Sequence, residues 1–204
     1  MTWVGASPEP LLPSMGPPPT ERSDAARNRA RVLEVARSIV ATEGVAGITM
    51  DRVAAQSGVG KGTVFRRFGS RGGLLRALLD DTEREFQGRF LSGPPPLGPG
   101  APPLERLVAF GRERIAVLST QSELLRASAA PDENHYAVPA RRVAALHVAT
   151  LLRQAEVPGD VPVLAFELLA VLEAILTAPP GARPPIDRLA AGWEQLVRSL
   201  DRAA

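Results

Sequence analysis

The chain has 204 residues, of which 45% are hydrophobic, 23% are charged and 4% are aromatic, and its formal net charge is +2. Disordered chains are poorer in apolar residues and more strongly charged, so this composition indicates a globular protein. No cysteine is present, which excludes disulfides, thiolate metal sites and cysteine nucleophiles. The sequence shows neither an apolar run long enough to cross a membrane nor a signal peptide. We therefore expect a cytoplasmic protein without a membrane partner.

Most of the 20 prolines gather in two segments. Residues 1–20 hold the first group and show no helical periodicity, which predicts a disordered N-terminal arm whose true start is either Met1 or Met15. Residues 93–103 hold the second group together with glycines, which predicts a linker. No proline lies between the two segments. Because proline interrupts helices, this long proline-free stretch is predicted to be helical.

Three short-range patterns divide the proline-free stretch. Apolar residues at intervals of three and four predict a first helix over residues 23–43, and Gly44 is a suitable stop. Thr49 is a good N-cap for a second, short helix. Residues 57–59, Ser-Gly-Val, predict a tight turn, and residues 60–68 predict a third, short helix.

The remaining helices complete an all-α fold. Ser70 can cap a fourth helix that continues to about residue 92. Later helices are predicted near residues 103–120, over the segment SELLRASA, from Pro139 to about Glu156, after Asp160 over the segment VPVLAFELLAVLEAILTA, and from Ile186 to Leu200. The predicted domains are a helix-turn-helix unit at residues 21–70, a connecting helix at 71–92, and a helical ligand-binding and dimerisation domain at 104–204.

Positive charge is concentrated in residues 49–76, where six basic side chains accompany a single acid, Asp51. The six are Arg52, Lys61, Arg66, Arg67, Arg71 and Arg76. A segment at +5 within a nearly neutral protein is typical of a phosphate-binding surface. Two short helices joined by a glycine turn, the second one surrounded by basic residues, form the helix-turn-helix arrangement whose second helix enters the DNA major groove.

The run from Ile48 to Leu75, ITMDRVAAQSGVGKGTVFRRFGSRGGLL, closely resembles the DNA-binding segment of the TetR/AcrR family of bacterial repressors. The resemblance consists of a capping threonine, a Val-Ala pair, a Ser-Gly-Val turn, a Lys-Gly-Thr helix start and a basic residue that opens the fourth helix, all without gaps. It covers residues 25–90, and beyond them only the helical layout and the length agree.

The resemblance implies that this segment binds double-stranded DNA. Phosphate contacts are implied for Thr49, Lys61, Thr63 and Arg71, and hydroxyls at helix starts and bidentate arginines are chemically suited to phosphate. Arg66 and Arg67 extend from the third helix, and arginine is the commonest reader of guanine, so at least one should contact a base. The candidate DNA-binding residues are Thr49, Lys61, Gly62, Thr63, Phe65, Arg66, Arg67 and Arg71.

This sequence departs from the family at four positions. Phe65 stands where tyrosine is usual, and because it cannot donate a hydroxyl to phosphate we assign it mainly to packing. Arg66 stands where histidine is frequent. Gly72 and Gly73 replace acidic residues, which weakens the start of the fourth helix by about 1 kcal/mol per glycine.

Two patterns in the C-terminal half predict a homodimer. The segment from residue 161 to residue 178 is apolar on nearly every side, and such a helix must be covered on every side. The last helix has the spacing of a packed helical seam. The resembling family dimerises through its last two helices, which implies the interface residues Leu168, Leu172, Ile175, Leu189, Trp193, Leu196 and Leu200. A purely intramolecular core is the alternative reading.

In the resembling family the C-terminal half also binds a small molecule that lowers operator affinity. The candidate effector-binding residues here are Phe110, Arg114, Tyr136, His147, Phe166 and Glu167. A single histidine or glutamate on an apolar face is more often satisfied by a neighbouring side chain than by a ligand.

The expected function is therefore that of a nucleoid-associated homodimeric repressor that binds a palindromic operator and is released by a small molecule. The alternatives are a helical protein-interaction module, an activator and a regulator without a ligand. We expect no cofactor, no metal site and no enzymatic activity, because no nucleophile-base pair or carboxylate pair is visible. The glycines around Lys61 do not have the spacing of a phosphate-binding Walker loop.

Overall fold

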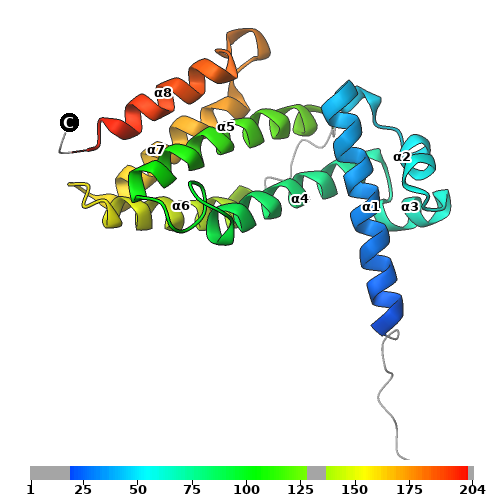
Figure 1. Ribbon diagram of the computed structural model, residues 1–204. Helices are drawn as coiled ribbons and strands as arrows, with labels where there is room; N and C mark the ends of the chain where they lie inside the picture. The colour runs from blue at the N-terminus through cyan, green and yellow to red at the C-terminus, as the bar shows by residue number, and fades with distance from the viewer. Residues whose placement is uncertain (1–18, 128–136, 202–204) are drawn as a thin grey trace, which may run out of the picture.

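The computed structural model describes residues 19–127 and 137–201, and every regular element within them is helical. The described residues form eight α-helices, two short 3-10 helices and no strand, which confirms the all-α fold class (Figure 1). The elements are α1 (Pro19–Glu43), η1 (Val45–Gly47), α2 (Met50–Ser57), α3 (Lys61–Phe68), α4 (Arg71–Ser92), α5 (Pro103–Ala127), α6 (Ala137–Gln154), α7 (Val161–Thr177), η2 (Pro180–Ala182) and α8 (Ile186–Arg198).

The first core lies between α1, α2, α3 and the first half of α4. It consists mainly of aliphatic side chains, including Val32, Leu33, Ile48, Val53, Val64, Leu74, Leu75 and Leu78. Three predicted local signals are confirmed around it. Gly44 ends α1 with φ 74°, Gly58 ends α2 in the left-handed region with φ 65°, and the Ser70 hydroxyl accepts a hydrogen bond from the Gly73 amide at 3.2 Å.

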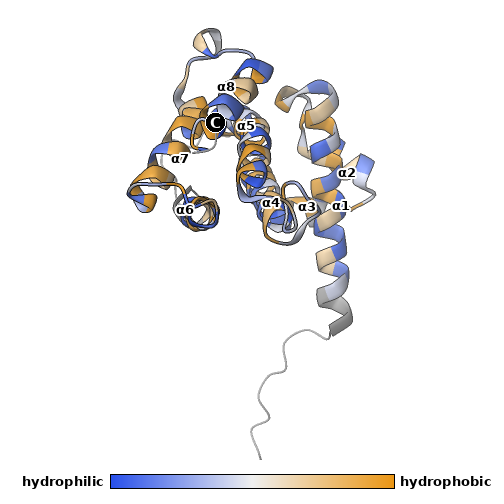
Figure 2. Cartoon of the chain, turned by 60° about the vertical axis from the view of Figure 1, so that its left-hand side comes forward, coloured by the Kyte–Doolittle hydropathy of each residue, from blue (hydrophilic) through white to orange (hydrophobic). Residues whose placement is uncertain are grey.

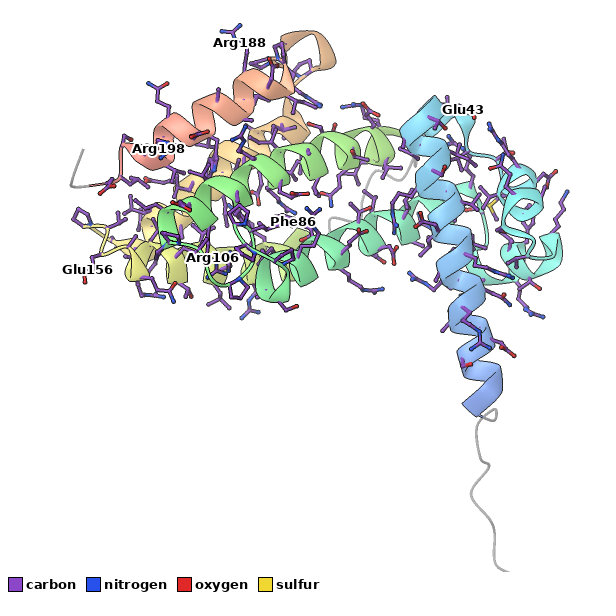
Figure 3. All side chains as sticks on the ribbon, in the orientation of Figure 1. Glu43, Phe86, Arg106, Glu156, Arg188 and Arg198 are labelled. Atoms are coloured by element: carbon purple, nitrogen blue, oxygen red, sulfur yellow. The ribbon has the colours of Figure 1, made fainter. Side chains whose placement is uncertain are left out.

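The second core lies in the C-terminal half, where α5 packs against α4, α6, α7 and α8. Its aromatic centre is formed by Phe86 and Phe90 of α4 and by Phe110 of α5. In Figure 3, Phe86 lies between α4 and α5. Helix α4 therefore contributes to both cores, and so does α5, whose Leu124 is buried in the first core.

Helix α5 corrects one of the predicted boundaries. The sequence indicated a helix near residues 103–120 and a separate short helix after it, but the structure has one continuous helix from Pro103 to Ala127. Ser119 and Ser122 do not interrupt it, because each hydroxyl donates to a backbone carbonyl three or four residues earlier.

The proline-rich segment after α4 packs onto the second core. Leu97 is buried in that core, and the Gly98 amide donates to the Pro94 carbonyl at 2.9 Å. The segment thus closes a compact turn between α4 and α5 instead of separating two bodies.

Trp193 fixes α8 on α5. Its indole Nε1 donates to the Leu107 carbonyl at 3.0 Å, and its ring fills the space above Gly111. A Cβ atom at Gly111 would lie 1.9 Å from the indole, so this helix contact requires glycine. Trp193 is therefore buried within the subunit, whereas the sequence analysis predicted it at a dimer interface.

Candidate nucleic-acid interface

Helix α2 begins at a threonine cap. The Thr49 hydroxyl accepts a hydrogen bond from the Arg52 amide at 3.2 Å, which satisfies one of the free N–H groups at the helix start. Val53 and Ala54 are buried against the first core, so α2 is held from behind while Thr49 stays exposed. This confirms the capping role predicted for Thr49.

Helix α3 is anchored by one buried side chain. Val64 faces the first core, whereas Lys61, Gly62, Phe65 and Arg66 are exposed on the other side. Phe65 is 40% exposed, which is unusual for a side chain that we assigned mainly to packing. The exposed side of α3 thus combines an aromatic ring with basic groups.

The structure divides the +5 segment into paired and unpaired charges. Arg52 forms an ion pair with Glu43, which lowers the pKa of that carboxyl chiefly through the hydrogen bond. Lys61 Nζ lies 2.7 Å from the Asp51 carboxylate. Arg66 and Arg67 are exposed and make no hydrogen bond or ion pair with any residue in the described parts of the chain. These two arginines are therefore the cations most available to an anionic partner.

Arg71 has a different environment from the phosphate contact that we predicted. Its guanidinium donates from Nε to the Ile48 carbonyl at 2.8 Å, from Nη2 to the Val45 carbonyl at 2.8 Å and from Nη1 to the Ala127 carbonyl at 3.2 Å. All three of its nitrogens are thus occupied by backbone acceptors. The sequence missed this role because all three acceptors are backbone carbonyls that lie 23, 26 and 56 residues away along the chain.

Gly73 is a further position whose role the sequence did not reveal. A Cβ atom there would lie 1.9 Å from the Phe68 carbonyl oxygen at the end of α3. The departure from the acidic residues common in the resembling family therefore has a steric cause, because α4 begins too close to α3 for any larger residue at this position.

This geometry agrees with the comparison to known families. Residues 32–78 match the model of the family described as bacterial regulatory proteins, tetR family. The matched segment contains η1, α2, α3 and the first turns of α4. Residues 32–78 are therefore similar to the segment that defines the tetR family.

Two curated relatives are named as transcriptional regulators. The HTH-type transcriptional repressor DrrR1 from Streptomyces coeruleorubidus is 35% identical over 114 residues, which are 56% of this chain and 38% of that protein. An HTH-type transcriptional regulator from Staphylococcus aureus (strain bovine RF122 / ET3-1) is 42% identical over 69 residues, which are 34% of this chain and 37% of that protein. The chain thus spans less than two fifths of the length of either relative. Neither relative is named as an enzyme, in line with our expectation for this chain.

Solved structures share the fold over most of the chain. The TetR transcriptional regulator SCO0520 from Streptomyces coelicolor is 24% identical with a TM-score of 0.61, covering 86% of this chain and 99% of that chain. A TetR-family transcriptional regulator from Pectobacterium atrosepticum is 21% identical with a TM-score of 0.64, covering 89% and 97%. AibR, solved in complex with isovaleryl coenzyme A and operator DNA, is 21% identical with a TM-score of 0.51, covering 83% and 97%. At these identities the similarity concerns the fold alone.

Within this tetR-type fold, the structure separates the six candidate effector residues. Phe110 and His147 lie together, with ring centroids 5.4 Å apart, and Phe90 stacks on His147 at 4.4 Å. Arg114 is buried, and its Nη1 lies 2.5 Å from a carboxylate oxygen of Glu83. Glu83 therefore pairs with one nitrogen of Arg114, while the Arg114 Nε is buried without a hydrogen-bond partner among the described residues.

The other three candidates do not join this cluster. Phe166 is 57% exposed on the outer side of α7, where the Arg141 guanidinium lies 4.7 Å from its ring centroid. Glu167 is exposed beside it. Their exposure contradicts the prediction that they line an internal pocket, because α7 turns this side away from the core. Tyr136 lies outside the described residues.

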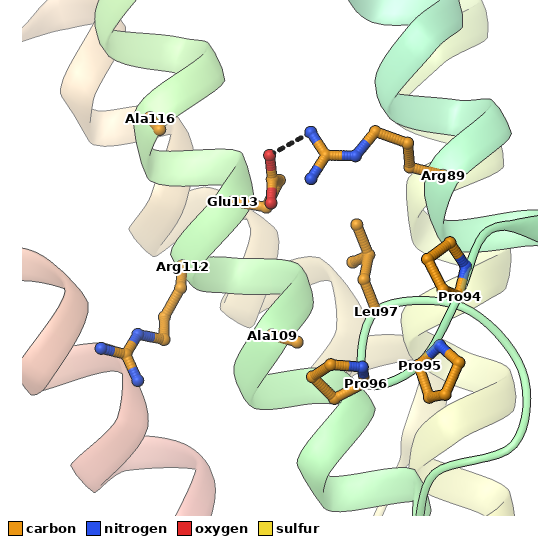
Figure 4. Close-up of a pocket in the computed structure, with 9 residues that line it drawn as sticks. All are labelled: Arg89, Pro94, Pro95, Pro96, Leu97, Ala109, Arg112, Glu113 and Ala116. Carbon is orange, nitrogen blue, oxygen red and sulfur yellow. Dashed lines mark hydrogen bonds and ion pairs between the residues drawn. The ribbon is translucent and has the colours of Figure 1, made fainter.

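A groove of about 410 Å³ lies elsewhere, between the end of α4, the turn at residues 94–97 and α5 (Figure 4). Leu97, Ala109 and Ala116 give it apolar walls, and the ion pair of Arg89 with Glu113 lies at its rim. Sites for small molecules are commonly about 300–1,000 Å³. None of the candidate effector residues lines this groove.

Most of the predicted dimer residues are buried within one subunit. Leu168, Leu172 and Ile175 join Trp193 in the second core, and Leu189 and Leu200 pack against it. Only Leu196 is exposed, at 36%, and it borders a hollow of about 290 Å³ between α5, α7 and α8. Apart from Leu196, these residues are therefore corrected to intramolecular contacts, and the seam spacing in α8 reflects its packing on α5.

Two absences concern only the described residues. Within 19–127 and 137–201, no group of three or more His, Asp or Glu side chains is arranged to hold a metal ion. No helix in these ranges combines the length and apolarity that crossing a membrane would require.

The His147 imidazole is buried without a hydrogen-bond partner for Nε2 among the described residues. Its burial, together with the positive charge of Arg106, lowers the pKa of His147 to about 4. The folded protein therefore holds a neutral imidazole at pH 7, stacked on Phe90. Protonation would place an unpaired charge in the aromatic cluster.

We expect the protein to lose stability as the pH falls from 6.5 to 4. Over this window the unfolded chain takes up a proton on His147 that the folded protein does not accept, so acid favours unfolding. The loss approaches about 2 to 3 kcal/mol near pH 4 and does not grow below it. Urea unfolding at pH 7 and pH 4.5 measures this loss, and His147→Phe should lack it. An equal pH dependence in both proteins would contradict the prediction.

Proposed function

We propose that this protein is a homodimeric transcriptional repressor that binds a palindromic operator through α3 and is released by a small molecule. One observation carries the DNA-binding part: α3 exposes Arg66 and Arg67, which have no partner among the described residues, while Val64 fixes the helix from behind. Arginines on the exposed side of a helix can enter the major groove and read guanine. The relative DrrR1 is named a repressor, which supports this direction of control.

Phosphate contacts complete the proposed DNA interface. Thr49 and Thr63 lie at the starts of α2 and α3, where free backbone amides favour an anion. Lys61 would exchange its contact with Asp51 for a phosphate oxygen, and Phe65 and Gly62 would lie against the DNA backbone beside it. The proposed site of action is the nucleoid in the cytoplasm.

Removal of at least one of the two exposed arginines of α3 should weaken sequence-specific binding. A selection from random double-stranded DNA first defines the preferred site. At least one of Arg66→Ala and Arg67→Ala should then make the free energy of binding to that site less favourable by about 1 to 3 kcal/mol and abolish the preference at one base position.

Arg142→Ala is the matched control for this experiment. It removes the same charge from an exposed position on α6 and should leave both affinity and preference unchanged. Unchanged affinity and preference in both α3 variants would exclude α3 as the recognition helix.

The dimer is supported by the outer side of α7. Phe166 and Val171 are each 57% exposed there, Val163 is 48% exposed, and Leu196 of α8 borders the adjacent hollow. Figure 2 shows α7 as a largely apolar helix at the edge of the subunit. Several large apolar side chains exposed on one helix favour an interface with another protein surface. A two-fold dimer would place two copies of α3 about 34 Å apart, on successive major grooves.

A charge on the outer side of α7 should dissociate the dimer. Sedimentation equilibrium at micromolar concentration should give a dimer for the wild type and a monomer for Val171→Asp, because two buried carboxylates would face each other without partners. Leu146→Asp is the control: Leu146 is 68% exposed on α6, outside the proposed interface, and this variant should remain dimeric. A monomeric wild type would exclude the proposed dimer.

We propose the groove of Figure 4 as the effector site. Its volume suits a small molecule, its walls are apolar, and two cationic side chains, Arg89 and Arg112, stand at its edge. The groove also lies between α4 and α5, the two helices that contribute to both cores. The fold neighbour AibR was solved with both a coenzyme A ester and operator DNA, so this fold is compatible with both kinds of partner.

Filling the groove should abolish the response to the effector. Compounds are screened for release of the selected operator, and Ala116→Trp should then require at least about ten times more of an active compound, because the indole occupies its space. Gln154→Trp, at the exposed end of α6, should respond like the wild type. Equal responses of Ala116→Trp and the wild type would exclude this groove.

A further inference from the structure

We propose that Arg71 is a positioning residue for DNA binding, which clamps the beginning of α2 to the end of α5 without touching DNA. This inference rests on the proposed DNA binding by α3. It assigns to Arg71 a connection between the DNA-binding helices and the C-terminal half.

The three acceptors of Arg71 come from two parts of the chain. Val45 lies in η1, and Ile48 immediately precedes Thr49, the cap of α2. Ala127 is the last residue of α5. One side chain on the first turn of α4 therefore joins the segment that leads into α2 to the C-terminus of α5.

These contacts suit a guanidinium in particular. A backbone carbonyl oxygen carries partial negative charge, so the cationic guanidinium is favourable beside the Ala127 carbonyl, which accepts from Nη1 at 3.2 Å. The planar fork of arginine directs N–H groups toward several acceptors at once, whereas a lysine ammonium is a compact charge on a flexible stem. No carboxylate in the described residues forms an ion pair with Arg71. Backbone carbonyls thus provide its observed contacts.

The start of α4 is built to direct Arg71 inward. The Ser70 hydroxyl caps the helix at the Gly73 amide, and Gly73 lies directly against the Phe68 carbonyl. A side chain at Gly73 would push α4 away from α3 and would move Arg71 with it. Buried Leu124 holds the last turns of α5 in the same region.

This arrangement provides a route from the C-terminal half to the DNA-binding surface. Helix α5 lines the proposed effector groove and carries α8, and its last carbonyl is held by the same guanidinium that holds the residue before Thr49. A displacement of α5 along or around its axis would therefore pull on the start of α2. The cap of α2 and the exposed side of α3 would shift relative to the DNA.

A direct phosphate contact and a clamp predict different salt dependences. Each lost phosphate contact reduces the magnitude of the negative slope of log K against log salt by about one. A lost clamp weakens binding without removing a phosphate contact, so the slope stays the same. Lysine could replace arginine at a phosphate, but it could not bridge three carbonyls.

The test measures operator affinity over a series of salt concentrations for Arg71→Ala and Arg71→Lys. Lys61→Ala serves as the reference for a lost phosphate contact. Arg84→Ala serves as the control, because it removes the same charge from an exposed position on the same helix. We expect both Arg71 variants to bind at least about tenfold more weakly with the slope of the wild type, and Arg84→Ala to bind normally.

Two results would overturn the clamp. If the magnitude of the salt slope falls by about one in Arg71→Ala and Arg71→Lys restores the affinity, Arg71 makes a phosphate contact. Wild-type affinity in both variants, measured well below their unfolding temperatures, would show that Arg71 does not position the helices. If Arg71→Ala does not fold, Arg71→Lys carries the same measurement, because it keeps the charge and most of the packing.

Amide hydrogen exchange tests the clamp without DNA. Arg71→Lys should exchange faster than the wild type in residues 44–54 and 120–127 and equally in α7. The exchange result does not depend on DNA binding. If the wild type bound no selected sequence, the proposed function would be excluded, but the clamp would not. Unchanged exchange in both segments would exclude the clamp.

Discussion

The continuity of α4 is the constraint on which the rest of the structure depends. Its first half places Leu74 and Leu75 in the core behind α2 and α3, and its second half places Phe86 and Phe90 in the aromatic centre of the C-terminal half. Helices of 22 residues without proline or another source of a kink bend only gently. The two cores are therefore joined by one continuous helix, with Arg71 as its first residue and Arg89, which lines the proposed effector groove, near its last residue.

The local chemistry of the DNA-binding segment could be predicted from the sequence. Thr49, Gly58 and Ser70 act within two to four residues of their own positions, so their capping and turn-forming roles are visible in the order of residues. The same holds for the spacing of Val53 and Val64, which face one core. These signals depend only on the local backbone geometry of helix ends and turns, so they do not require knowledge of the tertiary contacts.

The C-terminal half was harder to predict because its helices are apolar on more than one side. The sequence showed that α7 is apolar on nearly every side, but it could not show that Leu168 and Leu172 face the subunit's own core while Phe166 and Val171 face outward. The role of Arg71 was hidden for a related reason. Its acceptor at Ala127 is 56 residues away, and a carbonyl carries no side-chain signal.

The contact between Trp193 and Gly111 has a mechanical consequence. An indole seated over a glycine and hydrogen-bonded to the Leu107 carbonyl sets both the rotation and the register of α8 on α5, since any slide would drive the ring into a neighbouring side chain. Helices α5 and α8 therefore move together as one rigid unit. In a dimer joined through α7 and α8, a change in the angle between the subunits would be transmitted along α5 to its far end. The hinge of that motion would have to lie outside the contact between α5 and α8.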